Sequence, residues 1–193
     1  MPIKRYLLLF FIIIFAIYLF KEPLYTPTAL SASPKLTLFP KVIAHKSIIS
    51  GERQGNSLGA IQEALTSDVD GIEVDVRMSK DNILFLYHGN SLETYTNGTG
   101  RPDEYTWNEL SKLKYNGKHQ EKLVNLEEVF KLVGTKKFIC LDVKSETIVN
   151  KALYTEISKI IAKYNLKESV FVESFNPFFL IGMRLTNRDI LLM

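Results

Sequence analysis

From residue 41 onward the chain alternates short apolar runs with longer segments whose apolar residues recur every three or four positions. Six short runs have the length and the β-branched or aromatic composition of strands, and they cover residues 41–45, 70–76, 82–88, 136–144, 169–175 and 189–193. The longer segments predict helices at 56–67 and 146–164 and helix starts at Thr106, Asn125 and Asn176. This alternation of strands and helices predicts an α/β fold with a parallel sheet.

The N-terminus follows a different pattern. An uncharged apolar stretch, residues 6–20, comes directly after Lys4 and Arg5. Its length falls between the roughly 17–25 residues of a membrane-spanning helix and the roughly 7–15 residues of a signal-peptide core. Because the positive charges precede the apolar stretch, we predict that residues 1–22 form an uncleaved signal-anchor, a transmembrane helix with its N-terminus inside.

A cleaved signal peptide is the alternative for this segment, since residues 29–34 offer small side chains for cleavage. Residues 23–40 are rich in proline, serine and threonine, which predicts a linker to a domain at 41–193. Both alternatives place this domain outside the cytoplasm. It is membrane-anchored and extracytoplasmic in the first case, and secreted or periplasmic in the second.

Composition and motifs exclude several classes of protein. The net charge of +3 and the lack of a basic stripe argue against nucleic acid as a partner. The single cysteine, Cys140, cannot form an internal disulfide, and no cluster of cysteine and histidine suggests a zinc site. No glycine-rich loop follows the first predicted strand, which argues against a dinucleotide site.

Polar side chains gather at the carboxyl ends of the predicted strands, where the active face of a (β/α)₈ barrel lies. They are His45, Glu73, Asp75, His88, Asp142, Lys144, Glu173 and Ser174. Glu73 and Asp75 are two positions apart on one strand, so they share a face, with α-carbons roughly 6.6 Å apart. Together with Asp142 they offer the hard oxygen ligands that suit Mg²⁺ or Ca²⁺, and also Mn²⁺.

The histidines at strand ends, His45 and His88, add the groups that phosphoryl transfer needs. Imidazoles titrate near neutral pH, so a pair can act as general base and general acid while a cation neutralises charge on the phosphate. Lys46 and Lys144 add positive charge toward a phosphate oxygen. A structural role is the alternative for each residue taken alone, and only the joint pattern at the strand ends favours a catalytic site.

At these residues the sequence resembles the glycerophosphodiester phosphodiesterase family, which has a phosphatidylinositol-phospholipase-C-like barrel. The likeness covers residues 42–193 and is most specific over 71–113, with its E-x-D strand, its apolar strand ending in His88, and the motifs T-N-G-T-G and T-x-x-E-L. The stretches NLEEVF, LDVK and SFNP match later blocks of the family. The resemblance implies a (β/α)₈ TIM-type barrel with an insertion after its third strand, at about 92–122 in this chain.

The resemblance also implies an activity and roles for individual residues. Family members use a divalent cation to hydrolyse glycerophosphodiesters to glycerol phosphate and an alcohol. The resemblance therefore implies a glycerophosphodiester or a lysophospholipid-type molecule as the substrate of this chain. It implies that His45 and His88 are the acid/base pair and that Glu73 and Asp75 bind metal. The third ligand falls at Asp142, where most relatives carry glutamate, and Lys144 matches the lysine that follows it in the family.

Several positions depart from the family pattern. The first motif is His45-Lys46 rather than His-Arg, which loses the bidentate fork of a guanidinium. Gly55 and Gly89 stand where the family carries glutamate and aspartate. The alternative function is therefore that of a catalytically impaired or truncated family member that binds a ligand or is inactive.

The number of strands departs from the family as well. A barrel has eight strands and typically about 250 residues, whereas this chain offers about six strands. We therefore expect an apparently incomplete barrel, from a truncated gene product or an incomplete sequence. Dimerisation that closes the sheet is the less favoured alternative.

Overall fold

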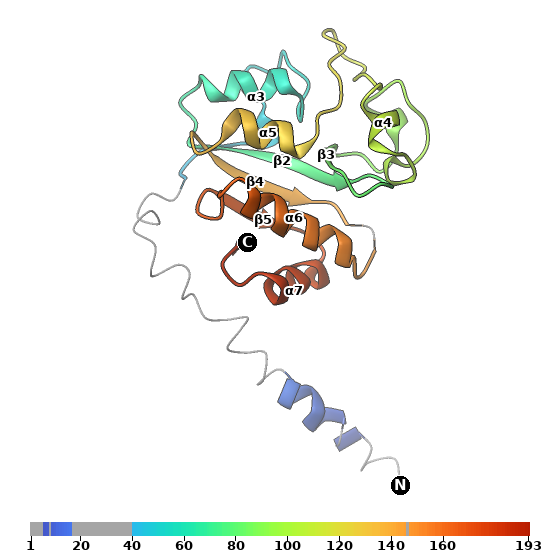
Figure 1. The fold of residues 1–193 in the computed structure, drawn as a ribbon, viewed down its shortest axis with the longest axis vertical. Helices are drawn as coiled ribbons and strands as arrows, with labels where there is room; N and C mark the ends of the chain where they lie inside the picture. Colours follow the sequence, from blue (N-terminus) through green and yellow to red (C-terminus); the bar gives the residue numbers. More distant parts are fainter. Residues whose placement is uncertain (1–5, 8, 17–39, 146) are drawn as a thin grey trace.

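The computed structural model describes residues 6, 7, 9–16, 40–145 and 147–193 of the chain (Figure 1). The strands of its single sheet are β1 Ile43–Ala44, β2 Gly71–Met78, β3 Leu84–Leu86, β4 Phe138–Val143, β5 Val170–Glu173 and β6 Leu191–Leu192. The helices of the domain are α3 Leu58–Leu65, α4 Trp107–Leu110, α5 Leu126–Val133, α6 Lys151–Lys163 and α7 Pro177–Thr186. Short 3-10 helices cover His45–Ser47, Leu92–Thr94 and Pro102–Glu104.

Five of the strands form a parallel sheet in the order β1-β2-β4-β5-β6. Each neighbouring pair is joined by a connection that contains a helix, in turn α3, α5, α6 and α7. Right-handed crossovers that always advance in one direction place their helices on one face of the sheet. In Figure 1 these helices follow one another from top to bottom along the sheet. The predicted α/β fold with a parallel sheet is confirmed.

The two faces of the sheet differ in chemistry because side chains alternate along each strand. On β2, Ile72 and Val74 point to the helices and belong to the main apolar core. Glu73 and Asp75 point to the opposite face. On β4, Ile139, Leu141 and Val143 join the same core, so Cys140 and Asp142 share the face of the two acids. The face that carries Glu73, Asp75 and Asp142, here called the polar face, is therefore the face where a functional site can form.

The third predicted strand, 82–88, is present but does not run parallel to the others. It contains β3, which runs antiparallel to β2 and pairs Val76 with Leu86 and Met78 with Leu84. A parallel neighbour needs a crossover of a dozen or more residues, and the few residues between β2 and β3 allow only a hairpin. The six strands are thus five parallel strands plus one hairpin strand, and β2 pairs directly with β4.

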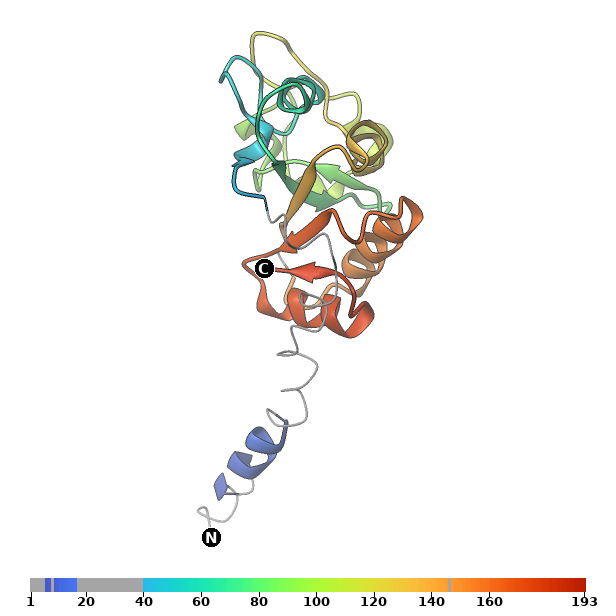
Figure 2. The same cartoon turned by 90° about the vertical axis from the view of Figure 1, so that its left-hand side faces the viewer.

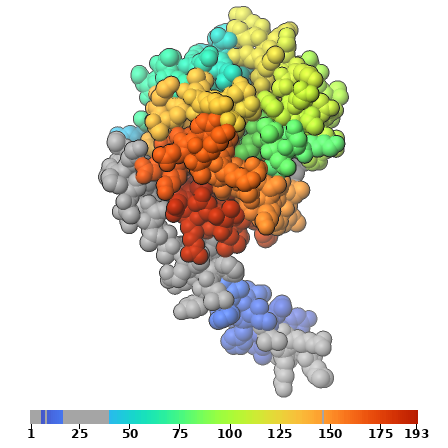
Figure 3. Space-filling model, in the orientation of Figure 1, coloured from blue at the N-terminus to red at the C-terminus, as the bar shows by residue number. Residues whose placement is uncertain are grey.

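The segment at 92–122, predicted as an insertion, packs on the polar face of the hairpin. Its Leu92, Leu110 and Tyr115 form a second apolar cluster with Phe85 and Tyr87 of the β3 region. In Figure 1 and Figure 2 the segment lies in the upper part of the molecule, away from α7. Figure 3 shows it as the yellow-green surface above the green hairpin. The segment at 92–122 therefore covers the polar face of the sheet at the hairpin.

The predicted helix at 146–164 begins later than expected. Helix α6 starts at Lys151, and the side chain of Asn150 caps it by accepting a hydrogen bond from the Leu153 amide. The preceding Ile148 and Val149 are β-branched residues, which lower helix propensity. The start of the helix was therefore predicted wrongly because the N-cap Asn150, four residues downstream, was overlooked.

The N-terminal predictions have little support in the described part of the chain. Residues 6, 7 and 9–16 are helical and expose their apolar side chains. Among the described residues, no helix combines the length and the apolar character needed to cross a membrane. The rest of the predicted signal-anchor and nearly all of the linker lie outside the described residues. The anchor and the location outside the cytoplasm therefore stay predictions.

Replacement of Asn125 by alanine is expected to lower the free energy of unfolding by about 1 kcal/mol. Asn125 is the N-cap of α5, and its Oδ1 accepts a hydrogen bond of 2.8 Å from the Glu128 amide. Urea denaturation measures the change. Asn108→Ala is the control, because Asn108 lies inside α4 and is exposed. Equal stabilities of the two variants would contradict the capping role.

Candidate active site

Three carboxylates meet on the polar face of the sheet. Glu73 and Asp75 come from β2, and Asp142 of β4 is paired in register with Asp75. One ligand oxygen from each residue lies within 4.8 Å of the others. Glu73 and Asp75 are 7% and 1% exposed, so neither carboxylate is well solvated. The structure thus brings together the three metal ligands that the sequence predicted.

The hydrogen bonding of this cluster is incomplete. Glu73 Oε1 and Asp142 Oδ1 are buried and have no hydrogen-bond partner among the described residues. Buried carboxylate oxygens are costly when unpaired, because they lose hydration without a replacement. Two such oxygens in one cluster of three acids fit a divalent cation with oxygen ligands. The donor set is all carboxylate, which suits Mg²⁺, Ca²⁺ or Mn²⁺.

The two acids on β2 differ in their electrostatics. Burial, together with the charges of Asp75 and Asp142, raises the pKa of Glu73 to about 7, against the lowering effect of the hydrogen bond from the Lys46 amide. Burial also acts to raise the pKa of Asp75, but hydrogen bonds from three neighbouring side chains outweigh it and hold this pKa below its ordinary value. Asp75 is therefore the fixed negative charge of the cluster.

His88 is aligned by Asp75. Its Nδ1 lies 2.9 Å from Asp75 Oδ1, although the two residues are thirteen positions apart. The hairpin explains this contact, because β3 folds back along β2 and the Tyr87 amide donates to the Asp75 carbonyl. The His88 side chain is 40% exposed, which leaves the imidazole open to solvent. A carboxylate on Nδ1 leaves Nε2 as the nitrogen that can exchange a proton.

His45 lies at the edge of the same cluster. Its Nε2 is 3.8 Å from Glu73 Oε2, and its side chain is 75% exposed. The turn that carries it is strained, since Lys46 and Ser47 both have a positive φ, of 52° and 59°. This turn aims the Lys46 amide at Glu73 Oε2, at 2.6 Å. The backbone of Lys46 thus contacts the cluster, while the predicted role of its charge stays a prediction.

Lys144 bridges the acids of the two strands. Its Nζ lies 2.9 Å from Asp75 Oδ1 and also contacts Asp142 Oδ2. Burial acts to lower the pKa of Lys144, but the hydrogen bonds and charges of Asp142 and Asp75 outweigh it and raise this pKa. A cation between two of the three carboxylates reduces their mutual repulsion. It also places a positive charge at the edge of the site.

Two site residues were not predicted from the sequence. Asn56 hydrogen-bonds Asp75 through its side chain and is 2% exposed. Arg77 continues the inward-facing alternation of β2 and donates to Asn90 Oδ1 and to the His88 carbonyl. Arg77 could have been predicted, because it lies two positions after Asp75 on the same strand and therefore shares the face of Glu73 and Asp75. For Asn56 the only signal was its place beside Gly55 in the altered family motif.

Gly55 and Gly89, the two glycines that depart from the family pattern, have little space for a side chain in this structure. A Cβ at Gly55 would lie 2.8 Å from Lys46 Cβ, closer than real Cβ atoms approach. A Cβ at Gly89 would lie 3.1 Å from both the Tyr87 ring and the Ser91 carbonyl. A larger side chain at Gly55 would therefore require the His45 turn to move.

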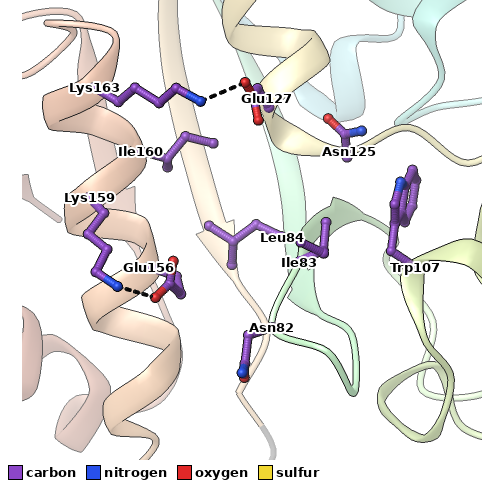
Figure 4. Close-up of a pocket in the computed structure, with 10 residues that line it drawn as sticks. All are labelled: Asn82, Ile83, Leu84, Trp107, Asn125, Glu127, Glu156, Lys159, Ile160 and Lys163. Atoms are coloured by element: carbon purple, nitrogen blue, oxygen red, sulfur yellow. Dashed lines mark hydrogen bonds and ion pairs between the residues drawn. The ribbon is translucent and has the colours of Figure 1, made fainter.

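Two cavities lie near the hairpin on opposite faces. One, of about 260 Å³, adjoins the acids and is lined in part by Arg77, Lys144 and Ser174. The other, of about 490 Å³, lies on the helix side between α6, the hairpin and Trp107 (Figure 4). Its charged lining residues pair with each other, Lys163 with Glu127 and Lys159 with Glu156. The first cavity borders the acidic cluster through Lys144, which contacts Asp75 and Asp142.

Comparison with known proteins gives a consistent result. A family model with the description "Glycerophosphoryl diester phosphodiesterase family" matches residues 49–191. A glycerophosphodiester phosphodiesterase of Caldanaerobacter subterraneus subsp. tengcongensis is 33% identical over 143 residues, which is 71% of this chain and 58% of the relative. Human glycerophosphodiester phosphodiesterase 1 is 31% identical over 161 residues, which is 77% of this chain and 46% of the relative. The chain thus spans about half the length of these relatives.

A solved structure shows the same fold. It is an Oleispira antarctica phosphodiesterase in complex with the product sn-glycerol-3-phosphate. The TM-score is 0.74 at 23% sequence identity, and the match covers 81% of this chain and 66% of that protein. A glycerophosphodiester phosphodiesterase of Agrobacterium tumefaciens matches with a TM-score of 0.71 at 20% identity, over 80% of this chain and 66% of that protein.

Proposed function

Because this chain belongs to the glycerophosphoryl diester phosphodiesterase family, we propose that it hydrolyses glycerophosphodiesters to glycerol phosphate and an alcohol with the help of a divalent cation. One observation carries the proposal. The acids Glu73, Asp75 and Asp142 form a buried cluster with two unpartnered oxygens, directly beside a histidine that one of them aligns. Cleavage of a phosphodiester needs a group that transfers protons and a positive charge that stabilises the phosphate, and a histidine next to a cation site provides both.

The cation would be held by Glu73, Asp75 and Asp142, and when bound it supplies positive charge that stabilises the negative charge of the phosphate. Lys144 adds a second positive charge at the edge of the site. The oxygen donors support Mg²⁺ or Ca²⁺, and also Mn²⁺, without selecting among them.

The proton transfers are assigned to the two histidines. Asp75 accepts a hydrogen bond from His88 Nδ1, which leaves Nε2 to take a proton from, or give one to, the reacting group. His45 Nε2 lies 3.8 Å from Glu73 Oε2, which supports His45 as the second acid/base group of the same site. Attack on phosphorus breaks the ester bond to the alcohol, and one histidine takes the proton of the nucleophile while the other protonates the leaving oxygen.

The substrate class is proposed from the family and one neighbour. The Oleispira antarctica phosphodiesterase holds sn-glycerol-3-phosphate as its product. In this chain, the cavity beside the acids carries the cations Arg77 and Lys144 and the hydroxyl of Ser174, groups that suit a phosphate and a polyol. This lining supports a glycerol phosphate moiety as the part of the substrate that is recognised.

Loss of catalysis with retained ligand binding is a second candidate function. Gly55 and Gly89 support it, since neither offers the carboxylate that the family pattern carries there, and a side chain at either position would require its neighbours to shift. This candidate predicts cation or ligand binding without turnover.

Removal of divalent cations by a chelator is expected to abolish hydrolysis of glycerophosphocholine by the full chain. Without a cation, the unpaired oxygens of Glu73 and Asp142 add negative charge where the phosphate must bind. Release of choline, measured with chelator and then with added Mg²⁺, Ca²⁺ or Mn²⁺, tests this. Restored turnover supports the proposed enzyme, turnover in chelator contradicts the role of the cation, and saturable cation binding without turnover favours the second candidate.

A further inference from the structure

Asn56 contacts Asp75 through both ends of its side-chain amide. Its Nδ2 donates to Asp75 Oδ2 at 2.7 Å, and its Oδ1 accepts from the Asp75 amide at 2.9 Å. The two residues are nineteen positions apart and both are buried. The second hydrogen bond fixes which end of the amide faces which atom, because a backbone N–H can only donate.

The contact fixes the plane of the Asp75 carboxylate. Its Oδ1 is taken by His88 and Lys144, while its Oδ2 is held by Asn56. Both carboxylate oxygens of Asp75 are therefore held in place by neighbouring side chains. A carboxylate with one oxygen released could rotate about its Cβ–Cγ bond, which would misplace the contact with His88.

The backbone of Asn56 has a separate role. Its φ is 65°, in the left-handed region that asparagine tolerates better than most residues. Its amide donates to the Lys46 carbonyl at 2.9 Å, which secures the turn that carries His45. The side-chain and backbone roles can be separated, because glycine keeps the left-handed backbone at no steric cost and removes only the side chain.

We propose that Asn56 is a positioning residue: its side-chain amide holds the Asp75 carboxylate in the orientation that binds the divalent cation and aligns His88. This inference rests on the proposed function, since it assigns the cluster to a cation. Residues that orient metal ligands typically contribute about 10–100-fold to metal affinity. Asn56 is not one of the three acids assigned to the cation, and it acts through Asp75.

The test compares Asn56→Gly with Asn82→Gly in the full chain. Asn82 lies in the turn between β2 and β3 and has nearly the same φ, 64°, but it is not one of the residues of the acidic cluster. Both substitutions therefore change the conformational entropy of the unfolded chain alike. Calorimetric titration with Mn²⁺ gives the dissociation constant of each variant, and a thermal melt in chelator reports folding.

We expect Asn56→Gly to weaken Mn²⁺ binding about 10–100-fold, while Asn82→Gly binds as tightly as the unmodified chain. An Asn56→Gly protein that melts cooperatively and binds Mn²⁺ within twofold of the unmodified chain would overturn the inference. Failure of the unmodified chain to bind Mn²⁺, Mg²⁺ or Ca²⁺ would instead overturn the metal-dependent function on which the inference rests.

A measurement on the unmodified chain covers the case in which Asn56→Gly does not fold. The side-chain amide of Asn56 is expected to give a distinct ¹⁵N NMR signal, because both its ends are hydrogen-bonded and the residue is buried. If it orients a cation ligand, its Nδ2 signal shifts saturably as Mg²⁺ is added, with the dissociation constant of the cation, and the ring nitrogens of His88 shift in parallel. An unchanged Asn56 signal at saturation would contradict the positioning role.

Discussion

Replacement of His88 by alanine is expected to lower the turnover of glycerophosphocholine by about 10²–10⁴-fold, the usual contribution of a general acid or base. Its imidazole is the only ring that a buried carboxylate aligns within the described residues, through the 2.9 Å contact with Asp75. The fold should survive, because the side chain is 40% exposed and Asp75 keeps Asn56 and Lys144 as partners. Steady-state kinetics with saturating cation measures the loss.

His119→Ala is the matched control for this variant. His119 is exposed in the segment that walls the site and is not part of the acidic cluster, so its loss should leave turnover unchanged. A circular dichroism melt of both variants separates lost chemistry from lost structure. Equal turnover of His88→Ala and the unmodified chain would remove His88 from the mechanism.

The sheet was predictable where the residue pattern repeats at short range. The alternation in β2 and β4 predicted strands whose apolar positions face the helices, and residues such as Ile72 and Leu141 lie there. The direction of β3 was a different problem, because its apolar run fits a parallel or an antiparallel partner equally well. Only the short turn at residues 79–82 decides for the antiparallel partner.

The acidic cluster was predictable for a similar reason. Glu73 and Asp75 are two apart on a strand, which fixes their common face, and Asp142 lies at the matching level of the adjacent strand. The contacts of Asn56 could not be predicted in this way. They depend on a left-handed turn and on a partner nineteen residues distant, neither of which has a periodic signature. The two unpartnered oxygens likewise become visible only once burial is known.

Replacement of Glu73 by glutamine is expected to have opposite effects on stability and on activity. In chelator, the free energy of unfolding should rise by about 1–3 kcal/mol, because a buried charge without a full set of partners is removed. The amide still accepts the hydrogen bond from the Lys46 amide, and its nitrogen can donate to the neighbouring acids. Turnover should fall at least about 10²-fold, since one anionic ligand of the cation is lost.

Thermal melts with and without Mg²⁺ give the decisive comparison. A cation that binds the folded state raises the melting temperature of the unmodified chain, and this increase should vanish in Glu73→Gln. Glu52→Gln serves as the control, because Glu52 is exposed in the loop before α3 and should change neither quantity. A destabilised Glu73→Gln protein in chelator would show that the carboxylate is fully satisfied without a cation. A stabilised and inactive one would mean that the chain retains an unpaired buried charge because cation binding needs it.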